Sequence, residues 1–472
     1  MDNKSTIAIR DIGELSIWGV ACIFIEEEGI ITLIPKNKDD ARLLFKHQFD
    51  EAFEFSYYSN FRKNIAYIRS VKTDFNHNVQ LITSYIIRVL DESSDISEIT
   101  LTGDAIDCFF NPAFFFYDKQ QAGEEISINL AYQSIVANEW EIFIEGTETT
   151  ISLSYGKILI RGIGSDLQLH PCLTASFPPT RDITFIIKVY QCITRFLRIV
   201  LYNYSCGSLK TQIFTCEKDG KSFNGFLKDY SVKKDSFKQS SPEANYRKLK
   251  PFIQQCLQFA ADNPVYSFVH YPGYGLRQTH YDCNTIDCIN IFSAFESECH
   301  ANKETFERAD ASNIESIKSQ AITCVEDLNS RDISTEEHNF LKQSKERISQ
   351  IGTQFGQRKR ITNAYQQLSN ALGSSTAHLL YRTYPQQQGV LDEKRIKRVA
   401  DRLTVLRSTI VHGDFSGELT PEDVQLFRFL EVLTYCMLLR RIGLRDSEIE
   451  VFIGAVFMCN DTVYSYLKTD ND

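Results

Sequence analysis

The chain has 472 residues, too many for one ordinary domain, and its 43% hydrophobic and 24% charged residues are typical of a globular protein. A formal net charge of −10 at pH 7 argues against nucleic-acid binding over the whole surface, although a local basic site stays compatible with it. The 13 cysteines follow no regular frame, the N-terminus lacks a basic and apolar leader, and the longest apolar run (183–204) contains three cations. We therefore expect a cytoplasmic protein with reduced thiols, no membrane helix and two or three domains.

The first two hundred residues have the texture of β-strands. In residues 15–36, two runs rich in β-branched and aromatic residues are separated by a short acidic turn that ends at Gly29, which predicts a hairpin. Residues 97–112 and 141–164 repeat this texture, with glycines at the turns. Residues 78–92 have apolar positions at mixed spacing and fit a helix or strands. We find no glycine-rich phosphate loop, metal motif or nucleophile elbow in this half.

A change of pattern near residue 182 predicts a helix, followed by a polar connection. Residues 182–203 have helical length, and the turn after them leads into a further strand that ends near residue 216. Residues 216–248 are polar and rich in Lys and Ser, which favours a linker or an exposed excursion. We place the domain boundary near residue 235. This gives a β-rich regulatory or sensing domain over residues 1–235 and a second domain over residues 236–472.

The second domain begins with helix patterns. Residues 285–307 carry apolar side chains at helical spacing, namely Ile289, Phe292, Phe295 and Cys299. A further helix is predicted over residues 312–328, because Ser312 is followed three residues later by Glu315, a capping-box pattern. A third is predicted over residues 335–355, beginning at Thr335.

The last two predicted helices have the clearest patterns. Residues 392–412 place apolar side chains at steps of 3, 4, 3 and 4, which predicts a packing seam of Ile396, Val399, Leu403, Leu406 and Ile410. The helix over residues 420–442 has Thr420 as N-cap and Pro421 at its first position, and its apolar interior predicts a central or interface helix. The fold class is therefore α+β: a β-rich N-terminal domain followed by an all-α bundle.

The end of the first of these two helices carries two polar side chains, in the stretch LRSTIVHGDF (406–415). Arg407 and His412 are five residues apart, which separates them by about 140° on a continuous helix. Gly413 fits the position after a helix end, so we expect the helix to end at His412. A frayed last turn, or a site shared by two chains, would bring both side chains to one phosphate.

A purely structural interpretation of the same pair is available. The helix macrodipole favours a histidine in the last turn, so His412 needs no further role there. Arg407 has two candidate carboxylate partners nearby, Asp401 and Asp414. The spacing of the pair is weak evidence when taken alone.

The context of the motif carries a family resemblance. LRSTIVHG resembles the Arg-x(4–6)-His motif of the HEPN superfamily of ribonucleases, and the order of the two halves is similar to the ApeA-like branch, in which a β-rich domain precedes a HEPN bundle. The stretch INIFSAFESECH fits an early helix of that bundle. Ser408 departs from the family pattern, where Asn or Asp often follows the arginine.

The resemblance implies an activity and its setting. It implies a metal-independent endoribonuclease without a cofactor, with a composite site in a homodimer or a higher even-numbered oligomer and a product that ends in a 2′,3′-cyclic phosphate. It further implies anti-phage defence by abortive infection, with tRNA or other host RNA as substrate and a phage protein as a possible trigger. The alternative is a catalytically silent HEPN-like module that binds a nucleotide or a protein in a defence or toxin–antitoxin assembly.

The two residue types suit RNA cleavage on chemical grounds. RNA supplies its own nucleophile, the 2′-OH, so cleavage needs a base, an acid and charge stabilisation. Histidine exchanges protons near neutral pH, and the planar guanidinium of arginine binds phosphate. One histidine cannot act as base and acid in a single step, so two chains across a two-fold axis would supply the pair.

Further residues are candidates for supporting roles. Ser408 and Glu296 are candidates to orient Arg407 or His412, although a surface glutamate on an amphipathic helix needs no function. Cations on the helix before the motif are candidates for RNA binding: Lys394, Arg395, Arg398 and Arg402. The runs 357–360 and 440–445 add cations to the same domain, and a solvated helix face is the alternative for each run.

One cluster raises the question of a structural zinc. His280, Cys283 and Cys288 have side chains that bind zinc, but paired C-x2-C knuckles are absent and the spacing is irregular. Reduced core cysteines explain the pattern better, and a zinc-stabilised scaffold is the weaker third hypothesis.

Overall fold

The computed structural model describes most of the chain, and all structural statements below concern these residues. They are 11–47, 52–59, 62–73, 78–91, 94–113, 135–158, 168–203, 206–217, 220–231, 246–263, 285–302, 311–330, 334–350, 356–373, 375–380, 383–384, 390–412 and 419–457. The chain divides into two compact units. The first comprises Met1–Gln239 with Asn245–Pro264, and the second comprises Ser240–Ala244 with Val265–Asp472.

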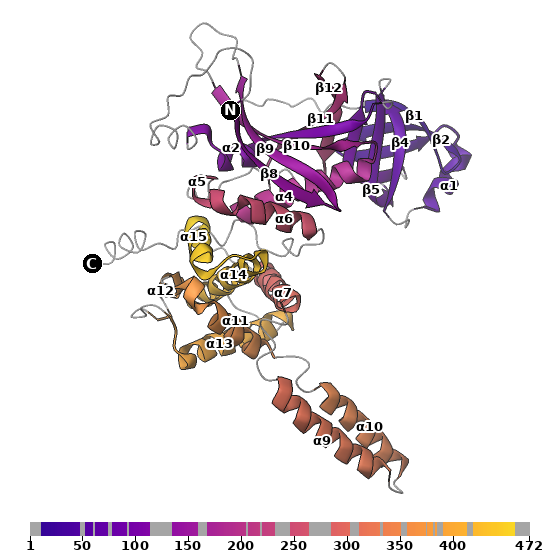
Figure 1. Ribbon diagram of the computed structural model, residues 1–472. Helices are drawn as coiled ribbons and strands as arrows, with labels where there is room; N and C mark the ends of the chain where they lie inside the picture. Colours follow the sequence, from indigo (N-terminus) through magenta and orange to yellow (C-terminus); the bar gives the residue numbers. More distant parts are fainter. Residues whose placement is uncertain are drawn as a thin grey trace, which may run out of the picture. The chain divides into compact units, whose positions relative to one another are not determined.

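The first unit is built on one antiparallel sheet of 12 strands (Figure 1). The strands are β1 (Asp11–Ile17), β2 (Val20–Glu27), β3 (Ile30–Pro35), β4 (Phe53–Ser59), β5 (Arg62–Thr73), β6 (Val79–Val89), β7 (Ile96–Gly103), β8 (Ile135–Ile144), β9 (Thr147–Ile158), β10 (Gln168–Thr180), β11 (Leu209–Glu217) and β12 (Gly220–Asp229). Their order is β1-β2-β3-β6-β12-β11-β7-β10-β9-β8, and β5 also pairs with β6 and with β4. A large antiparallel sheet in the N-terminal half is therefore confirmed.

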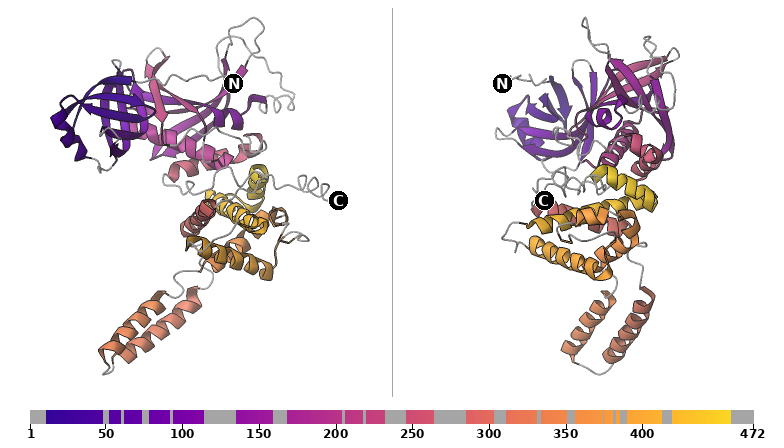
Figure 2. Two further views of the ribbon diagram at one scale, coloured as in Figure 1. Left: turned by 180° about the vertical axis from the view of Figure 1, so that it is seen from behind. Right: turned by 90° about the vertical axis from the view of Figure 1, so that its left-hand side faces the viewer.

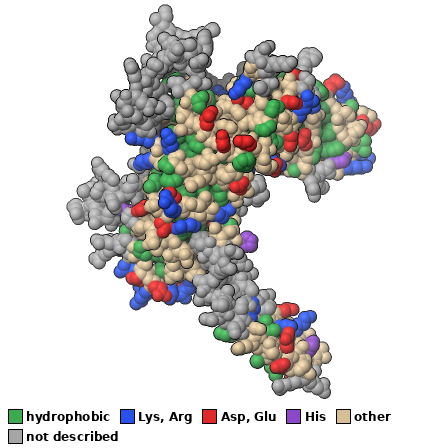
Figure 3. Space-filling view, viewed as in Figure 1, with side chains coloured by type: hydrophobic (Ala, Val, Ile, Leu, Met, Phe, Trp, Pro, Cys, Tyr) green, Lys and Arg blue, Asp and Glu red, His purple; other side chains and the backbone are tan. Residues whose placement is uncertain are grey.

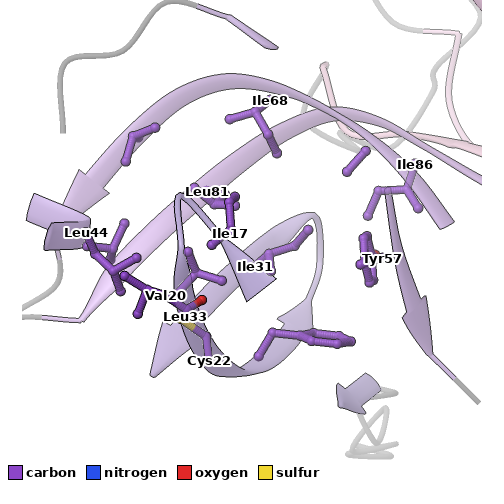
Figure 4. Close-up of a cluster of buried hydrophobic side chains, with 14 residues drawn as sticks. Ile17, Val20, Cys22, Ile31, Leu33, Leu44, Tyr57, Ile68, Leu81 and Ile86 are labelled. Atoms are coloured by element: carbon purple, nitrogen blue, oxygen red, sulfur yellow. Dashed lines mark hydrogen bonds between the residues drawn. The ribbon is translucent and has the colours of Figure 1, made fainter. Parts of the chain in front are cut away.

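The first six strands curl round a hydrophobic core, so that β1 lies against β4 (Figure 4). Alternate residues of β2 point inward, among them Val20, Cys22 and Phe24, as expected for a strand with one buried face. A Cβ atom at Gly13 of β1 would lie 2.7 Å from the ring of Phe24 and 3.3 Å from the carbonyl oxygen of Tyr58 in β4. A glycine at this position therefore leaves room for the Phe24 ring and for the close approach of β4.

A buried polar network joins five of these six strands, namely β1, β2, β4, β5 and β6. Ser59 donates to Asp11 (3.2 Å), Asn64 donates to Ser59 (2.9 Å), and Arg88 donates to Asn64 (2.7 Å). Arg88 also forms an ion pair with Asp11 and lies 3.6 Å from Glu26. Polar groups that leave water need such partners, so the network satisfies charges that the curled sheet buries.

The predicted hairpin with a turn at Gly29 is confirmed, because β2 and β3 pair across Glu28–Gly29. One further turn was missed, since residues 15–36 contain parts of three strands and the chain also turns at Trp18–Gly19. Both turns have positive φ at both central residues, the conformation of a type I′ hairpin turn. The first turn was missed because a bulky tryptophan rarely adopts positive φ. Residues 78–92, which fit a helix or strands, contain β6.

Helices α4 (Ile183–Leu201), α5 (Tyr246–Leu249) and α6 (Ile253–Asp262) lie along one side of this sheet (Figures 1 and 2). Helix α2 (Asp104–Phe109) packs against β7 and β10, and α1 (Ala41–Phe45) adds Leu44 to the core of the first strands. Short 3-10 turns lie at Lys38–Asp40 and Lys250–Phe252. The predicted helix after residue 182 is confirmed as α4, and its N-cap Asp182 accepts hydrogen bonds from the backbone of Thr184 (2.9 Å) and Phe185 (3.2 Å).

The predicted polar linker also needs a correction. Its first part forms β12, which lies inside the sheet between β6 and β11. The predicted boundary near residue 235 lies outside the described residues. Helix α6 belongs to the first unit because it packs on α4 and β8, and Arg195 of α4 donates to the carbonyl of Ala260 (2.9 Å). Polar composition was misleading here, because β12 is paired in the sheet although half of its residues are polar. Its only buried residues are Asn224, Gly225 and Leu227.

The second unit is helical, which confirms the predicted class of the C-terminal half. Its helices are α7 (Thr285–Ala301), α9 (Ala311–Asn329), α10 (Thr335–Gln350), α11 (Gln357–Leu372), α12 (Ser375–Leu379), α13 (Glu393–Val411), α14 (Pro421–Ile442) and α15 (Asp446–Phe457). Helix α14 is buried on nearly every face and packs against α7, α11, α12, α13 and α15. The predicted N-cap is confirmed, because Thr420 accepts from the backbone of Asp423 (3.2 Å).

Two local predictions in this unit are corrected. Phe292, Phe295 and Cys299 of α7 are buried as predicted, but Ile289 is exposed. Helix α10 is capped by Ser334 rather than Thr335, because Ser334 and Glu337 exchange hydrogen bonds in a capping box. None of the helices in the described ranges has the length and apolar character that crossing a membrane requires.

Candidate functional site

Helix α13 positions both residues of the predicted motif. One side of this helix is buried through the whole predicted seam, which comprises Ile396, Val399, Leu403, Leu406 and Ile410. Its N-cap Asp392 accepts from the backbone of Arg395 (2.8 Å). The helix ends at Val411, and the backbone N–H of His412 donates to the carbonyl of Ser408 (3.0 Å). The predicted end of the helix is therefore confirmed, while Gly413 lies outside the described residues.

Arg407 lies at the edge of the buried face and is held by α7. Its guanidinium is 2.7 Å from the carboxylate of Glu296, and the two side chains are 37% and 32% exposed. Glu296 was predicted to orient Arg407 or His412, and the structure places it beside Arg407. Asp401, which the structural interpretation offered as a partner of Arg407, pairs with Arg358 of α11 instead (2.8 Å). Asp414 lies outside the described residues.

His412 is exposed at the end of α13 and faces another direction. Its imidazole has no hydrogen-bond or ion-pair partner within the part of the chain that the structure describes. The five-residue step turns it about 140° away from Arg407 round the helix. Ser408 is also exposed, and its carbonyl accepts from the backbone of His412. One chain therefore presents Arg407 and His412 on different sides of α13.

The four predicted RNA-binding cations are all exposed on α13, but they differ in their partners. Arg402 forms two hydrogen bonds with Asp423 of α14, at 2.8 and 2.9 Å. Arg395 lies 3.4 Å from Asp392 and stacks over the ring of Tyr384. Lys394 and Arg398 form no ion pair with another described residue. Figure 3 shows Lys and Arg side chains gathered where α13 begins.

The spacing of the exposed positions on α13 forms a stripe that leads to the motif. Lys394, Arg398, Val405 and His412 are exposed at steps of four, seven and seven residues, so they lie on one side of the helix. We call these four residues the α13 stripe. The α13 stripe therefore begins with the two cations Lys394 and Arg398 and ends with the imidazole of His412.

The two basic runs are largely neutralised by neighbouring carboxylates. In 357–360, Arg358 pairs with Asp401, as described above. In 440–445, Arg440 pairs with Asp446 and Arg445 with Glu448. Ion pairs of this kind reduce the local positive potential, so these runs contribute less to a basic surface than their composition indicates.

Sequence reasoning missed the most buried charge of the bundle, Glu298. Its side chain is fully buried and accepts from Arg441 of α14 (2.8 and 3.1 Å) and from Asn302 (3.3 Å). Burial raises the pKa of Glu298, against the opposing effect of Arg441. A signal was present in the sequence, because Glu298 stands three residues after Phe295, on the apolar side of α7.

Asp423 is the buried acid that holds α13 and α14 together. Its side chain is 5% exposed. Burial acts to raise the pKa of Asp423, but hydrogen bonds from Arg402 and Thr420 outweigh it, so the pKa lies below its ordinary value. The Arg402–Asp423 ion pair therefore lies about one and a half helical turns before Arg407 on α13.

Two of the three candidate zinc ligands lie outside the described residues. His280 and Cys283 are in that part of the chain, and Cys288 is buried on α7. Among the residues that the structure describes, no group of three or more His, Cys, Asp or Glu side chains is arranged to hold a metal ion.

Comparison with known proteins gives no independent assignment. No protein-family model, curated protein or solved structure matches this chain.

Proposed function

We propose that the chain is a HEPN-type, metal-independent endoribonuclease whose site is formed by Arg407 and His412. The observation that supports this most is the contrast between the two side chains. Glu296 fixes the guanidinium of Arg407 at 2.7 Å, whereas His412 leaves its imidazole exposed at the end of the same helix. A fixed cation and an accessible proton-transfer group are what RNA cleavage requires.

The proposed chemistry uses the nucleophile that RNA supplies. The imidazole of His412 takes the proton from the 2′-OH, whose oxygen attacks the adjacent phosphorus, and the 5′-oxygen leaves with a proton from an acid. Arg407 binds the phosphate and stabilises the charge of the pentavalent state. The product then carries a 2′,3′-cyclic phosphate.

The directions of the two side chains support a composite site. The angle of about 140° prevents one chain from offering both groups to the same phosphate. In a symmetric dimer in which the ends of the two α13 helices lie side by side, His412 of each chain would face Arg407 of the other across one RNA backbone. One imidazole then acts as the base and the other as the acid.

The surface next to the motif suits a polyanionic substrate. Lys394 and Arg398 have no carboxylate partner among the described residues, so their charges are available to phosphates. The family resemblance proposes tRNA or other host RNA as the substrate and anti-phage defence in the cytoplasm as the setting. In this hypothesis the first unit restrains the nuclease until a phage product binds.

The test compares wild type with Arg407→Ala and His412→Ala, expressed to the same level. Matched controls are Arg445→Ala and His338→Ala, which remove exposed residues of the same types from the same unit. We expect wild type and both controls to cut total RNA into fragments with cyclic phosphate ends and to arrest growth after phage challenge. Neither motif variant should do so. Cleavage of RNA by both motif variants at the wild-type rate would contradict the proposed function.

A non-enzymatic module is the second candidate. The Glu296–Arg407 ion pair favours this candidate, because it joins α7 to α13 and neutralises the guanidinium without any substrate. In that case the protein would bind nucleotide or protein, and wild type would leave RNA intact while binding persists in His412→Ala.

A further inference from the structure

Helices α9 and α10 form a hairpin with an unusual surface. They pack against each other side by side in both views, and no described side chain of either helix is buried (Figures 1 and 2). Three large apolar side chains are exposed, Ile317 at 66%, Leu328 at 41% and Phe340 at 68%. Because helices in water are held mainly by burial of an apolar face, this surface indicates a partner.

The exposed apolar residues of α9 lie along one line. Ile317, Cys324 and Leu328 follow at steps of seven and four residues, which places them on the same side of the helix. We call these three residues the α9 stripe. Ile322 and Val325 are less exposed and lie roughly 100° further round, on the side that packs against α10.

Phe340 of α10 belongs to the same face of the hairpin as the α9 stripe. Leu341 and Ile348 are half-buried and lie on the side of α10 that faces α9. Lys345 lies to one side of this line round the helix, and Phe340 lies to the other side. Lys345 lies 2.6 Å from Glu326, which is roughly 180° from Ile317 on α9. The ion pair therefore marks the face opposite the α9 stripe, and Phe340 points to the stripe's own face.

The charges on this face are arranged for a second copy of the chain. Glu336 lies near the turn between the helices, whereas Arg347 lies near the other end, and both are on the same side of α10 as Phe340. Both are exposed and form no ion pair with another described residue. A two-fold axis across the middle of the hairpin would bring the basic end of one copy against the acidic end of the other.

We propose that two copies of this chain pack through their α9–α10 hairpins into an antiparallel four-helix bundle. The α9 stripe and Phe340 of one copy cover those of the second. Arg347 of each copy lies beside Glu336 of the other, and Cys324 lies close to the two-fold axis. This inference does not rest on the proposed function, although such a contact would keep two motif helices in one assembly.

A charge-swap experiment on the full-length chain tests the contact. The variants are Arg347→Glu and Glu336→Lys, and a short bis-maleimide links Cys324 between copies. The Cys324→Ser variant reports any link through the other cysteines. We expect wild type to be cross-linked, each charge variant to be cross-linked at least tenfold less, and an equimolar mixture of the two to recover the wild-type yield.

The mixture makes the test independent of folding, because only folded hairpins with complementary charges can recover the link. Equal cross-linking in the separate variants, or no gain on mixing, would overturn the inference and show that another surface covers the hairpin. The RNA experiment is separable from it. His412→Ala should lose cleavage and keep the Cys324 link, whereas a wild-type chain that cleaves RNA but is not linked through Cys324 would refute only the hairpin contact.

Discussion

Two arginines on α13 should behave in opposite ways when each is replaced by alanine. Arg402 and Arg407 are five residues apart on the same helix, and each forms an ion pair with a carboxylate of another helix. If Arg407 binds RNA and Arg402 joins two helices, Arg407→Ala should lose activity with little loss of stability. Arg402→Ala should lose stability. Alanine favours the helix, so neither change is penalised by helix propensity.

The structure gives different magnitudes for the two changes. Arg402→Ala leaves the 5% exposed carboxylate of Asp423 without two hydrogen bonds, which costs about 2 kcal/mol. Arg407→Ala removes one contact between side chains that are 37% and 32% exposed, which costs about 0.5 kcal/mol. In a unit of this size, we expect the thermal midpoint to fall by about 6 °C for Arg402→Ala and by about 1 to 2 °C for Arg407→Ala.

The assay is thermal unfolding of the full-length variants, with hydrogen exchange of α13 peptides to assign the change to the second unit. The pKa of Asp423 is lowered in the folded state, so its ion pair contributes stability at neutral pH that is lost as the pH falls through this lowered value. The gap between wild type and Arg402→Ala should therefore shrink on acidification. A loss of several degrees in Arg407→Ala would refute the reasoning, because Arg407 would then be a structural residue.

Three further predictions concern stability. We expect Gly103→Ala to cost about 2 kcal/mol more than Gly220→Ala in denaturant unfolding, because both glycines have positive φ near 135° but only Gly103 has backbone atoms where a Cβ would stand. Thr420→Ala should cost about 1 kcal/mol in thermal unfolding, because it removes the N-cap of α14; an unchanged midpoint would contradict this. Glu298→Leu and Arg441→Met should each cost about 3 kcal/mol, whereas the double variant should cost less than their sum; full additivity would show that the buried pair is not coupled.

The helices of the second unit were largely predictable because their patterns are local. The apolar seam of α13 and the cap of α14 depend on residues within a few turns, and both are confirmed. The strands were harder to place. Strand β12 has the composition of a linker, because half of its residues are polar and only Asn224, Gly225 and Leu227 are buried. Its place in the sheet depends on pairing with β6 and β11. The turn at Trp18 was missed because its residue type gives no turn signal.

The sequence alone determined where the candidate motif lies and how its helix ends. The five-residue step between Arg407 and His412 fixes their different directions, because helix geometry depends only on backbone hydrogen bonds between near neighbours. The tertiary structure decided what each charged side chain meets. The pairs Glu296–Arg407, Glu298–Arg441 and Arg402–Asp423 join residues of different helices. Such pairs form only when packing brings the helices together, and no local pattern distinguishes the arginine that joins two helices from the one proposed to bind RNA.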